Sequence, residues 1–429
     1  MHTSPLINAS RSGLRRWRRM ALAATAVAIG ATPLALTGAG SASATSTPTA
    51  PPPLTILTNS TNIGGGDYFI TPTGDTGTYA NGPEIVNSAG RVIWFHAIPV
   101  GQTASDFRTQ TYHGQTVLTW WQGTGLGGLS NGTDYIYNTH YRQIATVNAG
   151  NGETTDGHEF LITPQNTALI TSYDTATANL TSIGGPDDQV VIDGIVQEID
   201  IATGKVLFQW NSADHVPYSD SEQPLPASAS TPWDWFHINA VHLDTDGNLL
   251  INSRATWTAY KVNRSTGAII WELGGKQGSF KEEAAPGQTL DSAGEIFAWQ
   301  HDPEALGNNE YTFFDNDSEG TPLLPYSREV TVKLDLWDHV ATLVSSVDQP
   351  EGLSAASQGN AQTLANGDLV VGWGSLPYFS ELTFSGKLVF NAEFPSGVNT
   401  YRAFRLPWNE GSGSSGGWGG RGGSGGRGR

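Results

Sequence analysis

The sequence predicts an all-β protein, and within that class a six-bladed β-propeller with about four antiparallel strands per blade. Composition is the first reason: the 429 residues include 52 Gly, 14 Trp, 13 Tyr and 15 Phe, and only 14% are charged. Such a chain is typical of short strands joined by turns rather than of long helices. Repetition is the second reason, because a pair of β-rich runs recurs six times. Six copies suit a propeller better than a sandwich or a β-helix.

The second run of each pair has the clearer pattern. Four copies place a turn with Gly before a short apolar run, as in SAGRVIWF and STGAIIWEL, and two copies are degenerate. In chain order the six second runs are 88–95, 140–147, 202–210, 265–273, 336–344 and 384–394. Because turn residues bound each run, each is predicted to be a strand.

The first run of each pair lies upstream of the second and is also predicted to be a strand. The six first runs are 65–72, 113–121, 165–173, 246–254, 308–315 and 366–373. A final run, 399–408, has no partner after it. We expect it to return to the first blade and close the ring, which would remove exposed sheet edges.

The two ends of the chain differ from this body. Residues 1–44 contain five Arg, an apolar run and a small-residue site at Ala42-Ser43-Ala44, which is typical of a cleaved export signal. The Arg pairs favour the twin-arginine route, and the general secretory route is the alternative. We divide the chain into a signal peptide (1–44), a Pro/Thr-rich linker (45–58), a propeller domain (59–410) and a Gly/Ser/Arg tail (411–429). The mature chain is expected to be secreted, with no membrane span.

Charge and cysteine content exclude several classes of function. Without the signal and the tail, 14 basic residues remain against 40 acidic ones, a net charge of −26. This charge disfavours nucleic acid as a partner, because binding to phosphates needs a basic surface. The chain has no Cys, which excludes disulfides, a thiolate nucleophile and a thiolate metal site.

Three histidines occupy one place in successive repeats. His158, His237 and His301 each lie ten to twelve residues before the same point of the first run in their repeat, and the last repeat has Asn360 there. Equivalent positions on propeller blades face the same central funnel, so the three imidazoles should converge. A single His would more often be structural, but recurrence in register favours a shared site.

Two further residues belong to the repeat of His237. Arg254 ends its first run, and Asn239 lies two residues after His237, on the same side of a strand. A cluster of three His, one Arg and one Asn favours an anionic ligand. Zinc is the alternative, because three imidazoles suit it and Glu159 and Asp302 are close in sequence. The guanidinium argues against a cation in the same place.

Several segments together resemble one family. DWFHIN, INSR, AWQHD, FFDNDSEG and PYSRE are similar in order and spacing to segments of the arylsulfotransferases, which use aryl sulfates rather than a nucleotide sulfate as donors. The resemblance extends over residues 60–408 and is closest to the shorter members, which lack an extra N-terminal domain. Two features depart from the family pattern: the chain has no Cys pair, and Asp302-Pro303 follows His301.

The resemblance implies a six-bladed propeller and ping-pong transfer of a sulfuryl group from an aryl sulfate to a phenolic acceptor. It implies that His301 becomes sulfated, that His237 and Arg254 hold the sulfuryl oxygens with support from Asn239, and that His158 is the remaining site histidine. This chemistry suits the residue types. A neutral imidazole can attack sulfur, a second one can protonate the leaving phenolate, and an Arg stabilises the charged oxygens.

Four aromatic residues are candidates for flat walls around an aryl group: Trp120, Trp121, Trp373 and Tyr378. Packing inside the blades is the alternative for each. No organic cofactor is expected. The segment DNDSEG, with Asp315 and Asp317, has the spacing of a calcium loop, although tight turns use the same residues.

Two other functions remain open from the residues alone. One is a non-catalytic secreted propeller that binds a glycan or a protein. The other is a metal-dependent lyase or hydrolase built on the same fold.

Overall fold

The computed structural model describes residues 48–60, 65–74, 77–125 and 129–408, all within one compact unit, Thr47–Arg429. These residues form 26 strands and three short 3-10 helices: η1 (Thr181–Ile183), η2 (Ser212–Asp214) and η3 (Tyr218–Asp220). Among them, no helix is long and apolar enough to cross a membrane. The predicted signal peptide (1–44) and tail (411–429) lie outside the described residues.

The strands form five sheets. The sheet at the start of the chain has the order β26-β2-β3-β4: Val398–Leu406, Asp67–Gly74, Glu84–Val86 and Val92–Phe95. The next contains β5 (Thr103–Tyr112), β6 (Gln115–Thr124), β7 (Asn131–Asn138), β8 (Gln143–Val147), β9 (Thr154–Ile162), β10 (Thr167–Ala178), β11 (Gln189–Asp200) and β12 (Lys205–Asn211).

The other three sheets follow in chain order. The third contains β13 (Ile238–Leu243), β14 (Leu249–Ser253), β15 (Thr258–Val262) and β16 (Ile269–Leu273). The fourth contains β17 (Lys281–Ala284), β18 (His301–Gly307), β19 (Glu310–Asp315), β20 (Arg328–Asp335) and β21 (Val340–Asp348). The fifth contains β1 (Thr55–Asn59), β22 (Asn360–Thr363), β23 (Leu369–Gly372), β24 (Tyr378–Leu382) and β25 (Leu388–Glu393). Neighbouring strands in these three sheets are antiparallel, apart from the parallel pair β17–β21.

All twelve predicted runs coincide with strands. The first runs overlap β2, β6, β10, β14, β19 and β23, and the second runs overlap β4, β8, β12, β16, β21 and β25. The backbone conformation explains why Gly recurs in the turn that begins a second run. Gly204 and Gly267 have φ of 70° and 74° in the turns that lead into β12 and β16. Residues with a Cβ rarely adopt this conformation.

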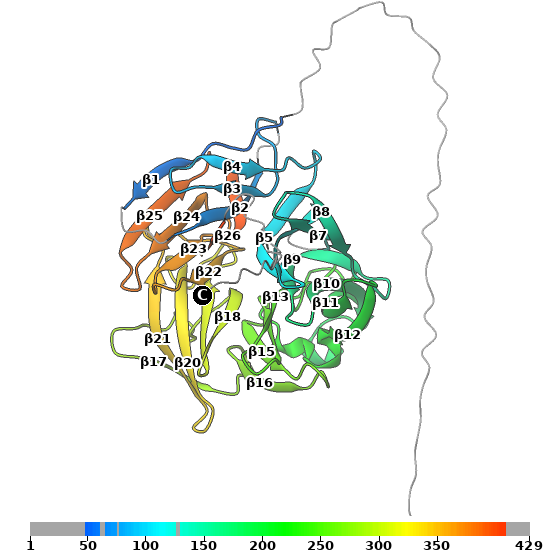
Figure 1. The fold of residues 1–429 in the computed structure, drawn as a ribbon. Coiled ribbons are helices and arrows are strands. Elements are labelled where there is room, and N and C mark those ends of the chain that lie inside the picture. Colours follow the sequence, from blue (N-terminus) through cyan, green and yellow to red (C-terminus); the bar gives the residue numbers. More distant parts are fainter. Residues whose placement is uncertain (1–47, 61–64, 75–76, 126–128, 409–429) are drawn as a thin grey trace, which may run out of the picture. The chain divides into compact units, whose positions relative to one another are not determined.

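The innermost strands of the sheets lie around a common centre (Figure 1). They are β26, β5, β9, β13, β18 and β22, and each contacts the next in this order, with β22 contacting β26 again. The arrangement is all-β and propeller-like, so the predicted fold class is confirmed in this form. The predicted six separate blades are not found: the structure distinguishes four blades, which are the sheets of four or five strands, and the remaining sheet has eight strands.

The difference from six blades lies in the eight-stranded sheet. Here β7 joins β9 at a single pair of residues, Gly132 and Thr155. Gly132 has no side chain, and a Cβ at this position would lie 2.4 Å from the Trp121 ring. The indole Nε1 of Trp121 donates to the carbonyl oxygen of Thr155 at 3.1 Å. This close approach makes the strands on both sides one continuous sheet.

Two strands from the ends of the domain close it. β26 pairs with β2, as the final run was expected to do. β1 pairs with β25 as the outermost strand of the last sheet. The prediction of a linker over 45–58 is therefore wrong for its C-terminal part, because residues from Thr55 onward belong to β1. Its alternating exposed and half-buried residues are typical of an edge strand, a pattern that the Pro-rich stretch before it obscured.

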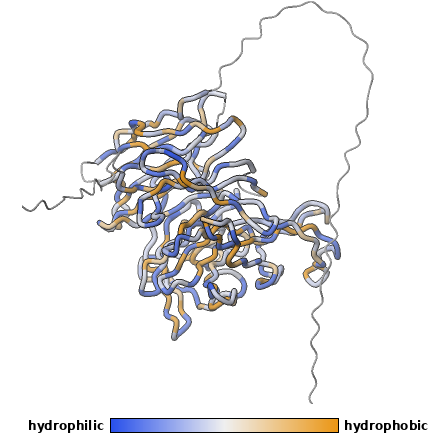
Figure 2. The backbone as a smooth tube through the Cα atoms, turned by 45° about the vertical axis from the view of Figure 1, so that its right-hand side comes forward, coloured by the Kyte–Doolittle hydropathy of each residue, from blue (hydrophilic) through white to orange (hydrophobic). Residues whose placement is uncertain are grey.

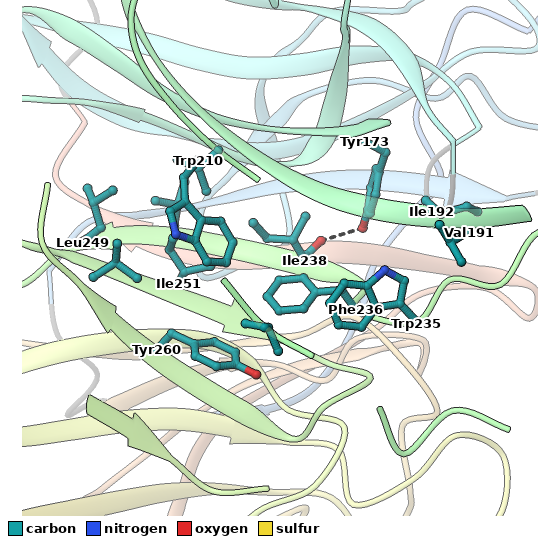
Figure 3. Packing of buried hydrophobic residues seen from close by; sticks show 14 of the residues in the cluster. Tyr173, Val191, Ile192, Trp210, Trp235, Phe236, Ile238, Leu249, Ile251 and Tyr260 are labelled. Carbon is teal, nitrogen blue, oxygen red and sulfur yellow. Dashed lines mark hydrogen bonds between the residues drawn. The ribbon is translucent and has the colours of Figure 1, made fainter. Parts of the chain in front are cut away.

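Apolar side chains between neighbouring sheets form the core. Six clusters of buried residues lie in the described part of the chain. Apolar and polar residues alternate over short distances along the backbone (Figure 2), as expected where each strand has a packed and a polar side. Figure 3 shows one cluster, in which Trp210 packs near Ile251 and the hydroxyl of Tyr173 donates to the carbonyl oxygen of Ile238 at 2.6 Å.

Candidate active site

Side chains from several inner strands line one cavity of about 480 Å³. His158 lies on β9, His237 immediately precedes β13, and His301 begins β18. Arg254 directly follows β14 and Tyr401 lies on β26. The rings of His158 and His237 are 5.2 Å apart. The structure thus brings together the four residues that the sequence proposed for chemistry, although 143 residues of chain separate the first from the last of them.

His301 is fixed in one tautomer by Asn316, which follows β19. The amide nitrogen of Asn316 donates to the carbonyl oxygens of Ala355 and Gln358, both at 3.0 Å. Its Oδ1 therefore faces Nδ1 of His301, at 2.6 Å. Because this oxygen can only accept, Nδ1 carries the proton and Nε2 has the lone pair. That lone pair accepts the backbone N–H of Gln358 at 3.1 Å.

The environment of His301 also keeps the ring neutral. The side chain is buried. Burial, and after it the positive charge of Arg254, lower the pKa of His301 well below its ordinary range. Its ring is therefore an uncharged imidazole at neutral pH, with an electron pair on Nε2. This is the form in which a histidine acts as a nucleophile.

The other two histidines have carboxylate partners instead. Nδ1 of His158 lies 2.7 Å from Oδ2 of Asp156, and Nδ1 of His237 bonds to Oδ2 of Asp234. Asp156 also accepts hydrogen bonds from Ser130 and Thr171. Burial would raise the pKa of Asp156, but the charge of His158 and these hydrogen bonds lower it. A carboxylate at Nδ1 stabilises the protonated ring, so these two imidazoles suit proton transfer and the binding of negative oxygens.

Arg254 brings a buried positive charge to the same cavity. Its Nη2 donates to the carbonyl oxygen of Ala356 at 2.8 Å, and Nη1 lies 3.4 Å from Oε1 of Glu319. The guanidinium lies over the ring of Trp299, 5.0 Å from its centroid. Nε is buried and has no hydrogen-bond partner among the described residues. The positive charge of this guanidinium at the cavity suits an anionic ligand.

Asn239 lies behind the cavity rather than in its lining. The residue is fully buried. Its Nδ2 donates to the carbonyl oxygen of Gln300 at 2.8 Å, and its Oδ1 accepts from Asn252 at 2.7 Å. The structure therefore corrects the prediction that Asn239 belongs to the anion-binding cluster, because it does not line the cavity. Asn239 holds the backbone immediately before His301. Asn360, at the same place in the last repeat, hydrogen-bonds both backbone groups of Ala403 on β26.

The four aromatic candidates are not walls of the cavity. Trp120 and Trp373 are buried in apolar clusters between sheets, and Trp121 is buried at the junction of β7 and β9. Tyr378 lies on β24, where its hydroxyl donates to Glu393 at 3.1 Å. Blade packing, the alternative that the sequence left open, accounts for all four. The aromatic residue that does line the cavity is Tyr401.

A buried ion network lies next to the cavity and consists of Asp106, Arg108, Glu159, His242, Asp302 and Arg402. Glu159, Asp302 and Arg402 each directly follow a cavity residue in sequence: His158, His301 and Tyr401. Nη1 of Arg402 is 2.9 Å from both Asp106 and Glu159, and its Nη2 is 3.3 Å from Asp302. Burial lowers the pKa of His242, but the charges of Glu159 and Glu304 outweigh it and raise this pKa to about 9.

The charges of this network bear on the question of a metal. Glu159, His242 and Asp302 have ligand atoms spaced closely enough to hold an ion. However, two guanidiniums and the His242 imidazolium already face the three carboxylates of Asp106, Glu159 and Asp302. A divalent cation would have to bind beside these three positive groups, which would repel it. The three cavity histidines do not belong to this group, so the zinc alternative gains no support from them.

The calcium alternative for DNDSEG meets a similar obstacle. Nε of Arg328 donates to Asp315 at 2.9 Å, and Nη2 lies 4.0 Å from Asp317. A guanidinium thus stands where a cation would have to bind. Burial, and next Asp315, raise the pKa of Asp317 to about 10. Calcium at Asp315 and Asp317 stays a prediction, and these contacts favour a structural turn.

Sequence reasoning missed several residues of the site: Asp156, Asp234, Asn316, Glu319 and Tyr401. The two aspartates lie two and three residues before a site histidine, so proximity in sequence was an available signal. Asn316 and Glu319 lie in DNDSEG, which was considered only as a calcium loop or a turn. Nothing in the sequence pattern marks Tyr401, because it comes from the strand that closes the ring.

Comparisons with known proteins add to this geometry. Similar solved structures include a protein of unknown function from Bacteroides caccae (TM-score 0.46, 13% identity, 79% of this chain and 98% of that one). They also include a catalytically inactive virginiamycin B lyase from Staphylococcus aureus with quinupristin (TM-score 0.36, 13% identity, 80% and 88%). A third is the β-propeller domain of Cps50 from Myceliophteria thermophila (TM-score 0.35, 11% identity, 83% and 91%). Among curated proteins, no relative matches the chain.

One family model matches the chain over residues 108–395, and its description is arylsulfotransferase (ASST). The matched stretch contains all three cavity histidines and Arg254, together with Asp156, Asp234 and Asn316.

Proposed function

Because this chain belongs to the arylsulfotransferase family, we propose that it moves a sulfuryl group from an aryl sulfate to a phenolic acceptor through a sulfated His301. The observation that carries this proposal is the difference between the partners of the three imidazoles. Nδ1 of His301 faces a neutral amide, whereas Nδ1 of His158 and of His237 face carboxylates. An amide leaves the ring uncharged and nucleophilic, while a carboxylate favours the imidazolium.

In the first half-reaction, the hydrogen bond from the backbone N–H of Gln358 to Nε2 of His301 breaks, and the freed electron pair on Nε2 attacks the sulfur of the donor. A bond forms between Nε2 and sulfur, the bond from sulfur to the aryl oxygen breaks, and its electron pair stays on that oxygen. We assign the proton that neutralises this phenolate to the His158 imidazolium, because Asp156 stabilises its charge. Arg254 and His237 would bind the sulfuryl oxygens, whose negative charge a guanidinium stabilises in the transition state.

The intermediate is a sulfated imidazolium. The oxygen of Asn316 is too weakly basic to take the proton from Nδ1, so the ring keeps its positive charge and remains a good leaving group. In the second half-reaction, His158 takes the proton of the acceptor hydroxyl. The phenol oxygen then attacks sulfur, and the electron pair of the N–S bond returns to Nε2. Protons and electrons balance over the two steps, and the chain returns to its starting state.

We further propose that the eight-stranded sheet acts as two blades, which would give six. Two features support this. First, the strands divide into β5–β8 and β9–β12, and a single residue pair links β7 to β9. Second, one apolar cluster packs β6, β7 and β8 against β9, β10 and β11, as the other clusters do between separate sheets.

We also propose that the protein acts outside the cytoplasm. The Arg-rich, apolar and small-residue order of residues 1–44 supports this, since it is typical of an export signal. N-terminal sequencing of the protein from the culture medium would test the proposal. A mature chain that begins near residue 45 is expected, whereas an intact leader on a cell-retained protein would contradict it.

The central experiment uses p-nitrophenyl sulfate as donor and phenol as acceptor. Nitrophenol release should depend on phenol, give parallel double-reciprocal plots, and disappear in His301→Ala. With donor alone, the mass of the wild-type protein should increase by one sulfuryl group, and the mass of His301→Ala should not. His140→Ala, at an exposed position, is the matched control and should keep full activity.

Two other outcomes would redirect the proposal. Release of nitrophenol without any dependence on phenol would indicate a sulfatase that uses the same cavity. A folded protein that releases no nitrophenol and gains no mass would indicate a binding protein, the non-catalytic alternative.

A further inference from the structure

Glu319 brings a negative charge into the cavity that holds the three histidines. Its Oε1 is 3.4 Å from Nη1 of Arg254, and 38% of its side chain is exposed. The other acid of the cavity lining is Asp234, whose carboxylate bonds to His237. Glu319 is thus the more exposed of the two and pairs with the guanidinium that is expected to bind the sulfuryl group.

The position of Glu319 is fixed by its loop, which connects β19 to β20. On one side, the backbone N–H of Asp317 donates to Ala298 at 2.9 Å, and that of Leu323 donates to Asp317 at 2.7 Å. On the other side, the N–H of Gly320 donates to Oγ of Ser318 at 3.0 Å. The same loop contains Asn316, which orients His301. These bonds hold the backbone of the loop, and the Glu319 carboxylate lies between Arg254 and solvent.

A bound sulfuryl group and Glu319 would compete for Arg254. Both are negative, and like charges repel more strongly in a partly buried site than in water. The carboxylate should therefore weaken the binding of the anionic donor. After the first half-reaction, an acceptor enters a cavity that contains the sulfuryl group, this carboxylate and the carboxylate of Asp234.

We propose that Glu319 selects the acceptor by its charge. Phenols that carry an ammonium group are favoured, neutral phenols are intermediate, and phenols that carry a carboxylate are disfavoured. This inference rests on the proposed sulfotransferase function and adds the class of acceptor to it. Glu319 acts as a specificity-determining residue and takes no part in the bond changes.

Three acceptors of similar size test the proposal: 4-(2-aminoethyl)phenol, 4-ethylphenol and 3-(4-hydroxyphenyl)propanoate, each with p-nitrophenyl sulfate as donor. In the wild type, kcat/KM for the first should exceed that for the third about tenfold or more, and Glu319→Gln should reduce this ratio to about threefold or less. Glu310→Gln is the matched control. Glu310 is also 38% exposed and lies near a cation, Lys333, at 3.8 Å, but it lies outside the cavity lining. In Glu310→Gln, the ratio of kcat/KM for the ammonium phenol to kcat/KM for the carboxylate phenol should equal that of the wild type.

Binding of benzenesulfonate, measured by calorimetry, separates this inference from the proposed function. It needs no turnover, and Glu319→Gln should bind about three- to tenfold more tightly than the wild type. Equal acceptor ratios in wild type and Glu319→Gln would overturn acceptor selection even where transfer to 4-ethylphenol is normal. Absence of transfer to all three phenols would overturn both the function and the acceptor selection. A tighter sulfonate affinity in the variant would then still identify Glu319 as the charge that opposes anions.

Discussion

At the scale of single residues, the site depends on which atom faces each Nδ1. Three imidazoles share one cavity, yet their partners differ by one functional group, amide or carboxylate. This small difference leaves His301 with a neutral partner at Nδ1 and gives the other two rings a negative one. The difference comes from buried hydrogen bonds rather than from exposed charges, so salt should affect it little.

Replacement of the amide partner should change the acid limit of activity. In Asn316→Asp, a carboxylate at Nδ1 favours the charged ring, so the pKa of His301 rises from its depressed value. In the proposed mechanism only the neutral ring attacks sulfur, so the acid limb of the kcat/KM profile against pH should move upward by about one unit or more. The matched control is the reverse exchange, Asp234→Asn at His237, which should not move this limb upward. Superimposable profiles for Asn316→Asp and wild type, both folded by circular dichroism, would contradict the role of Asn316.

At the scale of elements, the inner strands combine the site with the buried ion network. β26 is the clearest case, because Tyr401 lines the cavity and Arg402 contacts three carboxylates of the network. Two neighbouring residues of one strand thus have different roles: Tyr401 lines the cavity and Arg402 stabilises the fold.

Loss of Arg402 should destabilise the fold strongly. Arg402→Met removes one buried positive charge and leaves Asp106, Glu159 and Asp302 without that partner. The free energy of unfolding should fall by about 3–5 kcal/mol. Lys333→Met removes a partly exposed ion pair with Glu310 and should cost about 1 kcal/mol or less. Urea unfolding of both variants measures the difference, and equal losses would contradict the importance of the network.

The same elements show how far sequence reasoning reaches. The second and fourth strands of the repeats were predicted, because turn residues bound them and apolar residues fill them. Apart from β26, the inner strands were not located, since they contain charged residues such as Asp106 and Arg108 on β5, which the apolar pattern of a buried strand does not include. The register of the three histidines predicted the cavity. Their hydrogen-bond partners were not predicted, because a sequence does not show which atoms face Nδ1.

At the scale of the whole molecule, the protein is a negatively charged body with a buried ion network inside it. The network makes stability depend on pH in the alkaline range. The pKa of His242 is raised to about 9 in the folded chain, against about 6.5 in an unfolded one. Its contribution is therefore fully present below pH 6.5 and is lost as pH rises through 9.

The free energy of unfolding should thus decrease between pH 6.5 and pH 9, by on the order of 3 kcal/mol from this group. The Gln side chain in His242→Gln cannot titrate, so the free energy of unfolding of this variant should not show the decrease that His242 causes. Urea unfolding at several pH values measures both slopes. Parallel curves for the wild type and the variant would show that His242 does not titrate with folding.

The place of β26 at the end of the folded chain also sets the order in which activity can arise during biosynthesis. The ribosome releases Tyr401 and Arg402 after every other residue of the cavity and of the ion network. A truncated or still-growing polypeptide has His301 and Asn316 but lacks one wall of the cavity and one counter-charge beside it. Competence for catalysis should therefore appear in a single step when the last strand inserts beside β2. A protease that cuts the connection before β26 would make that step reversible and would disable the enzyme without touching any histidine.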